Sequence, residues 1–357
     1  MLVSRVPAMQ RHRGVDIEMS GPKAPTLEDV AQLAGVSTAT ISRVLNDPDK
    51  VIAKTREKVQ GAIDTLGYTP NFGGRALASS KTTTVGAIIP TMANAMFSSG
   101  IQAFQEVLAE AGVTLLIAST GYDPARELQQ IKSLLANGAG GLLLIGKERP
   151  EETQSFLKKR NVPYVISWCY ANDPAQIFVG FDNFKAAYNA TIKILGCGHR
   201  KIAMISGVTR GNDRAQDRQE GVRSAVGDFG DGARLISVVE EKYLLEHGRS
   251  AFAAIVSGKD PVSVIICGND VLAAGAMMGA RDRGIKIPEE ISIVGFDDIG
   301  LASVLTPPLT TVRVPQIEMG RAAAKVLLAR LSGQNEVNSL ELTTDFIKRA
   351  SLLDRVP

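Results

Sequence analysis

The sequence predicts a chain with an N-terminal all-α helix-turn-helix headpiece followed by an α/β core of two doubly wound parallel sheets. Three observations support this fold class. The 357 residues are more than one ordinary hydrophobic core accommodates. Residues 26–66 show the periodicity of short helices, and from Lys81 onward short β-rich runs alternate with helical stretches. This alternation occurs twice, which indicates two similar α/β units.

The composition is typical of a globular chain. Hydrophobic residues make up 45% of the sequence and charged residues 22%. We find no run of about 18 apolar residues that could span a bilayer, and no apolar stretch of about 7 to 15 residues like that of a secretory signal peptide. We therefore predict a cytoplasmic protein with no membrane partner, and a disordered tail over residues 1–25 in which Met19 is an alternative start.

The residue types that form metal centres and catalytic triads are scattered along the chain. The cysteines and histidines are Cys169, Cys197, Cys267, His12, His199 and His247. No C-x-x-C spacing occurs, and the pattern supplies neither a set of metal ligands nor a pair of nucleophile and base. We expect reduced thiols, no metal, no cofactor and no enzymatic activity.

Two short helices joined by a glycine are predicted near the N-terminus. Thr26 and Asp29 have the spacing of a capping box, and the apolar residues that follow share one helical face. Gly35 can adopt the left-handed backbone of a sharp turn, and the Ser37 hydroxyl can cap the next helix. The net charge of +3 lies wholly within residues 1–83, which weakly favours a polyanionic partner for this end of the chain.

The second helix, "TATISRVLN", presents small residues around one long cation. Its inward positions are Ile41, Val44 and Leu45, and its outward positions are Thr38, Ala39, Ser42 and Arg43. Small residues let a helix enter the major groove, which is roughly 12 Å wide, and a guanidinium can donate two hydrogen bonds to O6 and N7 of guanine. Arg43 is therefore the predicted base-reading residue. The alternative is an ordinary helical corner that carries Arg43 as a solvated surface charge.

A third helix is predicted over residues 54–68. Its apolar stripe comprises Val59, Ala62, Ile63 and Leu66. Lys54, Arg56 and Lys58 lie near its start, where their side chains can reach DNA phosphates. Three such helices close a minimal hydrophobic core.

The remainder of the chain is predicted to form two parallel sheets. The first series of strands is "TVGAIIP", "TLLIAS", "GGLLLIG" and "PYVIS", and the second is "KIAMISG", "LISVVE", "SVIICG" and "ISIVGF". Helical stretches separate the strands of each series, as parallel βαβ units require. Because doubly wound sheets bind ligands at the carboxyl ends of their strands, we expect a ligand site in the cleft between the two units.

Several long motifs occur in an order that resembles the lactose/galactose-repressor (LacI/GalR) family of bacterial transcription regulators. They include "TLEDVAQLAGVSTATISRVLN", "LGYTPN", "LGCGHRKIAMISG", "CGNDVLAAGAM" and "IPEEISIVGFDD", and the likeness covers residues 26–350. "VGFDNFKAA" also resembles the gluconate-regulator branch. The resemblance implies a homodimer that binds double-stranded operator DNA and a periplasmic-binding-protein-like core that binds a small effector.

The resemblance also implies a division of the chain. The parts are a DNA-binding domain over 26–70, a hinge helix or flexible linker over 71–83, and a core over 84–357, with an N-subdomain at 84–182 and 315–341 and a C-subdomain at 183–314 and 342–357. Leu77 takes the place of the leucine that the family inserts into the minor groove. The sequence departs from the family at Gly73 and Gly74, which disfavour a hinge helix, and at Ile52, where a serine usually caps the third helix.

Base contacts fall, by this resemblance, on Thr38, Ala39 and Arg43. Phosphate contacts are implied for Ser37, Thr40 and Asn46. Ala39 is too short to donate a hydrogen bond to a base, so only a contact with a thymine methyl group is open to it.

The effector contacts implied by the resemblance are Met96, Phe97, Trp168, Arg218, Asn269 and Asp297. Arg214 lies one helical turn from Arg218, and two adjacent cations would favour an anionic ligand such as a sugar acid. Other interpretations remain for two of these positions. Phe97 fits a core aromatic residue, and Asp297 or its neighbour Asp298 fits a helix N-cap.

We therefore expect a repressor of a carbohydrate-utilisation operon, controlled by a sugar or a gluconate-like sugar acid. Two other functions remain open: a regulator that needs a purine-type corepressor, and a cytoplasmic sugar-binding protein without a DNA role. The C-terminal "RASLLDRVP" holds no leucine heptads, so we expect no coiled-coil tetramer.

Overall fold

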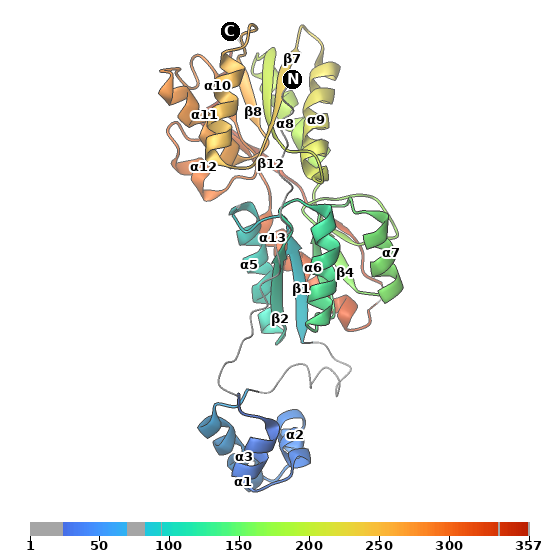
Figure 1. Ribbon diagram of the computed structural model, residues 1–357. Helices are drawn as coiled ribbons and strands as arrows, with labels where there is room; N and C mark the ends of the chain where they lie inside the picture. Colours follow the sequence, from blue (N-terminus) through green and yellow to red (C-terminus); the bar gives the residue numbers. More distant parts are fainter. Residues whose placement is uncertain (1–23, 70–82, 94, 335, 356–357) are drawn as a thin grey trace, which may run out of the picture. The chain divides into compact units, whose positions relative to one another are not determined.

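The computed structural model describes residues 24–69, 83–93, 95–334 and 336–355 (Figure 1). Its contacts divide the chain into two compact units, a headpiece up to Ala78 and a core from Ser79. Most of the predicted tail and nearly all of the predicted hinge, with Gly73, Gly74 and Leu77, lie outside the described residues.

The described part of the headpiece contains three α-helices and one short 3-10 helix. Their bounds are α1 Leu27–Ala34, α2 Thr38–Asn46, the 3-10 helix Pro48–Lys50 and α3 Ala53–Leu66. The Thr26 hydroxyl accepts from the amide of Asp29, whose carboxylate accepts in turn from the Thr26 amide, so the predicted capping box is confirmed. Gly35 ends α1 with a φ of 63°, which is the left-handed backbone predicted for the turn.

A small apolar cluster holds the three helices together. Val30 of α1, Ile41 of α2 and Val59 of α3 are fully buried at its centre. Within each helix the buried residues of this cluster include pairs three or four positions apart, so they lie on one side of the helix. The opposite side is left exposed. The headpiece fold therefore follows directly from local periodicity.

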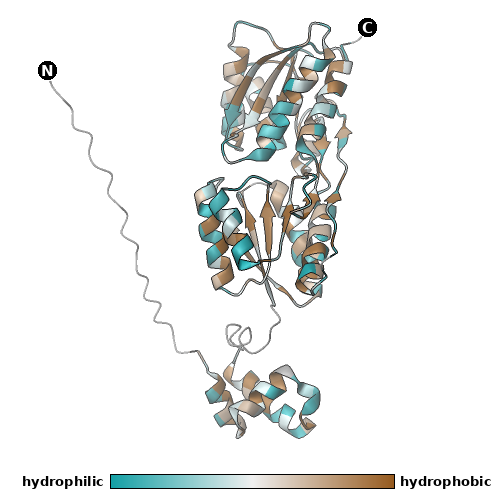
Figure 2. Cartoon of the chain, turned by 90° about the vertical axis from the view of Figure 1, so that its right-hand side faces the viewer, coloured by the Kyte–Doolittle hydropathy of each residue, from teal (hydrophilic) through white to brown (hydrophobic). Residues whose placement is uncertain are grey.

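The N-lobe of the core is built on a six-stranded parallel sheet in the order β11-β5-β4-β3-β1-β2. The strands are β1 Thr84–Ile89, β2 Thr114–Ser119, β3 Leu142–Ile145, β4 Tyr164–Ser167, β5 Phe178–Gly180 and β11 Leu340–Glu341. The helices around it are α5 Ala95–Glu110, α6 Pro124–Ala136, α7 Glu151–Arg160 and α13 Gln316–Leu331 (Figure 1). Strands β1, β3 and β4 are almost continuously buried, because helices cover both faces of this sheet (Figure 2).

The C-lobe is built on a four-stranded parallel sheet in the order β7-β6-β8-β9. The strands are β6 Lys201–Gly207, β7 Arg234–Glu241, β8 Val264–Cys267 and β9 Ser292–Val294, and the helices are α8 Asn183–Gly196, α9 Asp213–Phe229, α10 Leu245–Val256, α11 Asp270–Asp282 and α12 Gly300–Val304. The predicted α/β core with two parallel sheets is thereby confirmed.

The chain passes between the lobes more than once, which places the lobes close together. It leaves the N-lobe after β5, returns to it at α13, and leaves again after β11. An antiparallel pair, β10 Thr311–Arg313 and β12 Asp345–Ile347, joins two of these crossing segments. In each lobe, the carboxyl ends of the parallel strands lie on the side that faces the other lobe (Figure 1).

Serine in place of Ile52 should stabilise the headpiece. Ile52 is the N-cap residue of α3, makes no capping hydrogen bond and is 74% exposed. A serine hydroxyl there would accept from a first-turn amide and contribute about 1 kcal/mol. We expect amide hydrogen exchange in α3 of the full chain to slow about fivefold in Ile52→Ser. Ile52→Ala is the control, because it removes the same apolar side chain without adding an acceptor. Equal exchange in the two variants would contradict the prediction.

Candidate functional site

The exposed face of α2 carries the residues predicted to contact DNA. Thr38, Ala39 and Arg43 are exposed, whereas Thr40 is half-buried. Ile41 and Val44 on the opposite side are buried against α1 and α3. The helix therefore presents one long cation among small side chains, as the sequence predicts.

Ser37 precedes α2 and caps it. Its hydroxyl accepts from the Thr40 amide at 3.2 Å and shares a hydrogen bond with the Thr40 hydroxyl at 3.0 Å. The start of a helix is a favourable place for a phosphate because its first amides point outward. Asn46 is the last residue of α2, at the other end of the helix.

Buried polar side chains gather where the strands of the two lobes meet. Trp168 follows β4 in the N-lobe, Arg218 lies on α9, Asn269 precedes α11, and Asp297 follows β9. All four residues are at most 3% exposed. Trp168 and Asp297 also have positive φ angles, 61° and 110°. Such backbone strain in non-glycine residues is concentrated at functional sites.

Arg218 connects the polar groups of the C-lobe. Its Nη1 donates to the Gly268 carbonyl at 2.9 Å and lies 3.6 Å from Oδ1 of Asp297. The guanidinium carbon lies 4.5 Å from the ring centroid of Phe296. Burial raises the pKa of Asp297 well above its usual range, although the Arg218 charge opposes that shift.

Gln316, in the first turn of α13, links Asp297 with the N-lobe. Its Nε2 donates to the Asp297 carbonyl at 3.2 Å. Its own carbonyl and the Trp168 ring both approach Gly100 so closely that a Cβ atom on Gly100 would lie 2.6 Å from the ring and 3.0 Å from the carbonyl. Trp168 and Asp297 therefore belong to one continuous set of contacts.

Several buried atoms of this cluster have no hydrogen-bond partner among the described residues. They are Nε1 of Trp168, Nδ2 of Asn269, Oδ1 of Asn183 and both carboxyl oxygens of Asp297. Asn269 uses its Oδ1 to cap α11, and Asn183 uses its Nδ2 to donate to the Trp168 carbonyl. Buried polar atoms are rarely left unpaired, because their lost hydration costs about 1–3 kcal/mol each. The cluster thus offers donors and acceptors to a polar ligand.

Met96 and Phe97 lie in the first turn of α5 and belong to the hydrophobic core of the N-lobe. The Phe97 ring centroid lies 5.5 Å from that of Trp168, so Phe97 supports the tryptophan from the core side. The N-cap interpretation of Asp297 and Asp298 is wrong. Helix α12 begins at Gly300 without a side-chain cap, and Asp298 instead pairs with Arg313 and Arg349 at 2.7 and 2.6 Å.

Arg214 and Arg218 do not present two free cations. Arg214 is buried, and its Nη1 lies 2.6 Å from Oδ1 of Asp213, while Arg218 faces Asp297. Each arginine therefore has a carboxyl group beside it. The sequence predicted an anionic ligand from the two arginines alone, because it does not show that a carboxyl group lies beside each of them.

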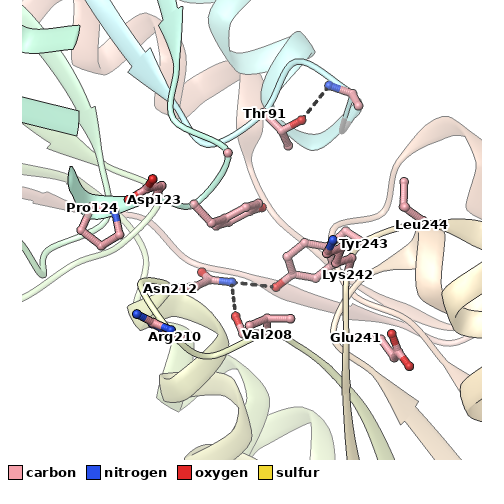
Figure 3. Close-up of a pocket in the computed structure, with 13 residues that line it drawn as sticks. Thr91, Asp123, Pro124, Val208, Arg210, Asn212, Glu241, Lys242, Tyr243 and Leu244 are labelled. Atoms are coloured by element: carbon pink, nitrogen blue, oxygen red, sulfur yellow. Dashed lines mark hydrogen bonds between the residues drawn. The ribbon is translucent and has the colours of Figure 1, made fainter. Parts of the chain in front are cut away.

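A pocket of about 550 Å³ opens between the loops that follow β1 and β2 in the N-lobe and those that follow β6 and β7 in the C-lobe (Figure 3). Its lining includes Thr91, Tyr122, Val208, Asn212, Tyr243 and Leu244. The volume lies in the range of small-molecule sites. None of the seven predicted effector residues lines this pocket. Its residues follow strands at their carboxyl ends, which is the signal that could have identified them.

Two tyrosines from different lobes meet in this pocket. The ring centroids of Tyr122 and Tyr243 lie 5.9 Å apart, and Nδ2 of Asn212 donates to the Tyr243 hydroxyl at 3.3 Å (Figure 3). Burial raises the pKa of Tyr122, and the charges of Arg218 and Asp297 also act on it. Tyr122 also lines a smaller cavity that Arg214 lines, and the pocket and the buried polar cluster together form the candidate effector site.

Within the part of the chain that the structure describes, no group of three histidine, cysteine, aspartate or glutamate side chains could hold a metal ion. None of the helices described there has both the length and the apolar character needed to cross a bilayer.

Asp297→Asn should reduce the pH dependence of the stability of the effector-free protein. Because the folded-state pKa of Asp297 is raised, its carboxyl group contributes stability at low pH that is lost as the pH rises through that pKa. Below that pKa the carboxyl is protonated, and asparagine resembles it. We expect the free energy of unfolding in urea to fall with rising pH more in the wild type than in the variant.

An ionised Asp297 paired with Arg218 would give the opposite result. A dominant ion pair would lower the pKa of Asp297, so a wild-type stability that rises with pH relative to that of Asp297→Asn would contradict the raised pKa. Arg223→Ala, which removes an exposed ion pair with Glu220 on the same helix as Arg218, is the control for nonspecific effects.

The comparisons with known proteins agree with this arrangement. Residues 26–71 match the model of bacterial regulatory proteins of the lacI family, and residues 194–352 match that of a periplasmic binding protein-like domain. Catabolite control protein A of Priestia megaterium is 30% identical and aligns over 88% of this chain and 95% of its own length. The HTH-type transcriptional regulator GntR of Escherichia coli (strain K12) is 30% identical over 88% of this chain and 94% of its own.

A solved structure extends the likeness to the whole fold. The lac repressor dimer bound to operator and the anti-inducer ONPF superposes with a TM-score of 0.79 at 25% identity, covering 93% of this chain and 100% of the other. With its helix-turn-helix headpiece, its two parallel-sheet lobes and these relatives, the chain belongs to the lacI family of bacterial regulatory proteins, which are DNA-binding regulators of transcription.

Proposed function

We propose that the chain is a cytoplasmic repressor of a carbohydrate-utilisation operon, and that a sugar-type effector in the interlobe cleft changes its affinity for operator DNA. The observation that carries the proposal is the exposed face of α2, where Arg43 stands among Thr38 and Ala39. A helix of this shape suits the major groove, and its arginine suits guanine.

On the DNA side, we assign base contacts to Thr38, Ala39 and Arg43, and phosphate contacts to Ser37, Thr40 and Asn46. The exposed Lys54, Arg56 and Lys58 at the start of α3 add cations for the phosphate backbone. We further assign the minor-groove contact to Leu77. A two-fold operator requires two headpieces, so the chain acts as a homodimer, as does the lac repressor in its operator complex.

On the effector side, we assign hydroxyl recognition to Arg218, Asn269 and Asp297, with Trp168 donating from Nε1. The unpaired donors and acceptors of this cluster suit the hydroxyl groups of a sugar, and Asp213 neutralises the charge of Arg214. The apolar faces of sugar rings pack well on aromatic side chains. Tyr122 and Tyr243 supply such faces from the two lobes.

The coupling between the two sites follows from the position of the effector. A ligand that contacts both lobes favours one relative arrangement of them, and a differential affinity of about 1–3 kcal/mol between two arrangements is enough for a switch. The arrangement of the lobes then changes the cost of ordering the segment between headpiece and core on DNA. An inducer and a corepressor differ only in which arrangement they favour.

Arg43→Met should weaken the sequence preference of DNA binding. On a duplex selected from random sequence by the wild type, we expect the loss of a bidentate base contact to cost about 1–3 kcal/mol, which is about 5- to 150-fold in affinity. Affinity for unrelated DNA should change little. Lys54→Met is the matched control, because loss of a phosphate contact weakens binding to all sequences uniformly and lowers its salt dependence. Equal losses on selected and unrelated DNA in Arg43→Met would contradict the assignment.

Effector binding should be visible through Trp168, the single tryptophan of the chain. We would titrate neutral sugars, sugar acids and purines while recording tryptophan fluorescence and operator affinity together. A neutral sugar should change both signals, and Asp297→Ala should abolish both changes because the two unpaired carboxyl oxygens are lost. A response to sugar acids alone would identify an anionic effector, and tighter operator binding with a purine would identify a corepressor.

A further inference from the structure

The loop that follows β3 in the N-lobe touches the first turns of α9 in the C-lobe. Nζ of Lys147 lies 2.6 Å from Oδ2 of Asp217, and the two side chains are 31% and 26% exposed. The backbone amide of Lys147 also donates to Oδ2 of Asp213. One residue of the N-lobe is thus tied to two carboxylates of the C-lobe, through its side chain and through its backbone.

Gly146 permits this close approach. Its φ is +85°, and a Cβ atom there would lie 1.9 Å from Nη1 of Arg214 and 2.5 Å from Oδ1 of Asp213. Any other residue would force the loop and the helix apart or displace the Asp213–Arg214 pair, besides straining the backbone. The contact between the lobes therefore depends on a glycine at this position.

A buried arginine holds the loop in place from the N-lobe side. Nη1 of Arg149 donates to the Gly146 carbonyl at 2.7 Å, and its Nε lies 2.9 Å from Oε1 of Glu127 on α6. The Gly146 amide donates to the Ser167 carbonyl at the end of β4 at 3.1 Å. The loop is thus fixed within its own lobe before it reaches α9, so little ordering is needed to make the contact.

We propose that Lys147, Asp213 and Asp217 form a latch that favours the closed arrangement of the lobes when no effector is bound. The latch does not use the unpaired atoms around Asp297, so its existence does not depend on the identity of the effector. Its consequence for regulation rests on the proposed function. The latch sets the fraction of effector-free protein in which the lobes are already closed, and hence how much an effector can still shift the equilibrium between the open and closed arrangements. Lys147 and Asp217 are positioning residues in this proposal.

The amide of Lys147 provides a direct measurement, because its acceptor lies in the other lobe. When the lobes part, this amide is released, whereas the neighbouring Gly146 amide keeps its acceptor within the N-lobe. We would measure residue-resolved hydrogen exchange on the full chain, comparing the wild type with Asp217→Ala. Residue 217 is remote from residue 147 in sequence, so the intrinsic exchange rate of the amide is unchanged.

In Asp217→Ala, exchange at the Lys147 amide should accelerate about two- to fivefold, the range that a partly exposed ion pair supports. Exchange at Gly146 should stay at the wild-type rate. Arg223→Ala is the matched control, since it breaks an ion pair at 2.8 Å within α9 that does not reach the other lobe. It should leave both amides unchanged. Unchanged exchange at Lys147 in Asp217→Ala, or equal acceleration in both variants, would overturn the latch.

The wild type offers a second measurement that needs no substitution. Raising the salt concentration from about 0.05 M to about 0.5 M screens an ion pair of this exposure, so exchange at Lys147 should accelerate relative to Gly146. If the ratio of the two rates does not respond to salt, the side-chain pair contributes nothing to closure and the proposal fails. Operator binding through Arg43 is measured separately, so failure of the latch leaves the DNA-binding proposal standing.

Discussion

The effector site depends on one constraint: the carboxyl ends of two parallel sheets face each other, and polar side chains from both are buried where they meet. Burying polar side chains costs free energy of folding, and Asp297 is the clearest case. Its two carboxyl oxygens are buried without a hydrogen bond, and its backbone has a φ of 110°. A fold selected for stability alone would not keep such a residue there. The strain and the unpaired atoms have a physical reason if a polar ligand completes the site.

In the headpiece, one small core leaves a whole face of a helix exposed. Its core is a single cluster around Val30, Ile41 and Val59, so one stripe of each helix is committed to stability and the opposite side of α2 is left exposed. The exposed side of α2 carries small side chains apart from Arg43, and small side chains allow a helix to approach the edges of the bases closely. The same helix therefore holds the fold on one side and offers a recognition surface on the other.

How much of this could be predicted from sequence depended on the range of the interaction. The capping box at Thr26, the turn at Gly35 and the long strands involve neighbours along the chain, and the sequence predicted them correctly. Strands β5, β10, β11 and β12 have two or three residues each and were not predicted, and β10 pairs with β12, a segment distant in the sequence. The contact of Tyr122 with Tyr243 requires the two lobes to come together, so no local pattern indicates it. Arg214 was predicted from its helical spacing to form a pair of cations with Arg218, yet its side chain pairs with Asp213 at the start of α9.

The central claim is that ligand binding between the lobes and operator binding by α2 are energetically coupled. Linkage requires that coupling to be reciprocal, so the most direct test measures the affinity for a cleft ligand with and without operator DNA, and the affinity for operator with and without that ligand. We expect the two ratios to be equal and to lie between about 5 and 150, which corresponds to about 1–3 kcal/mol. Two ratios of one, with both ligands bound, would contradict the account.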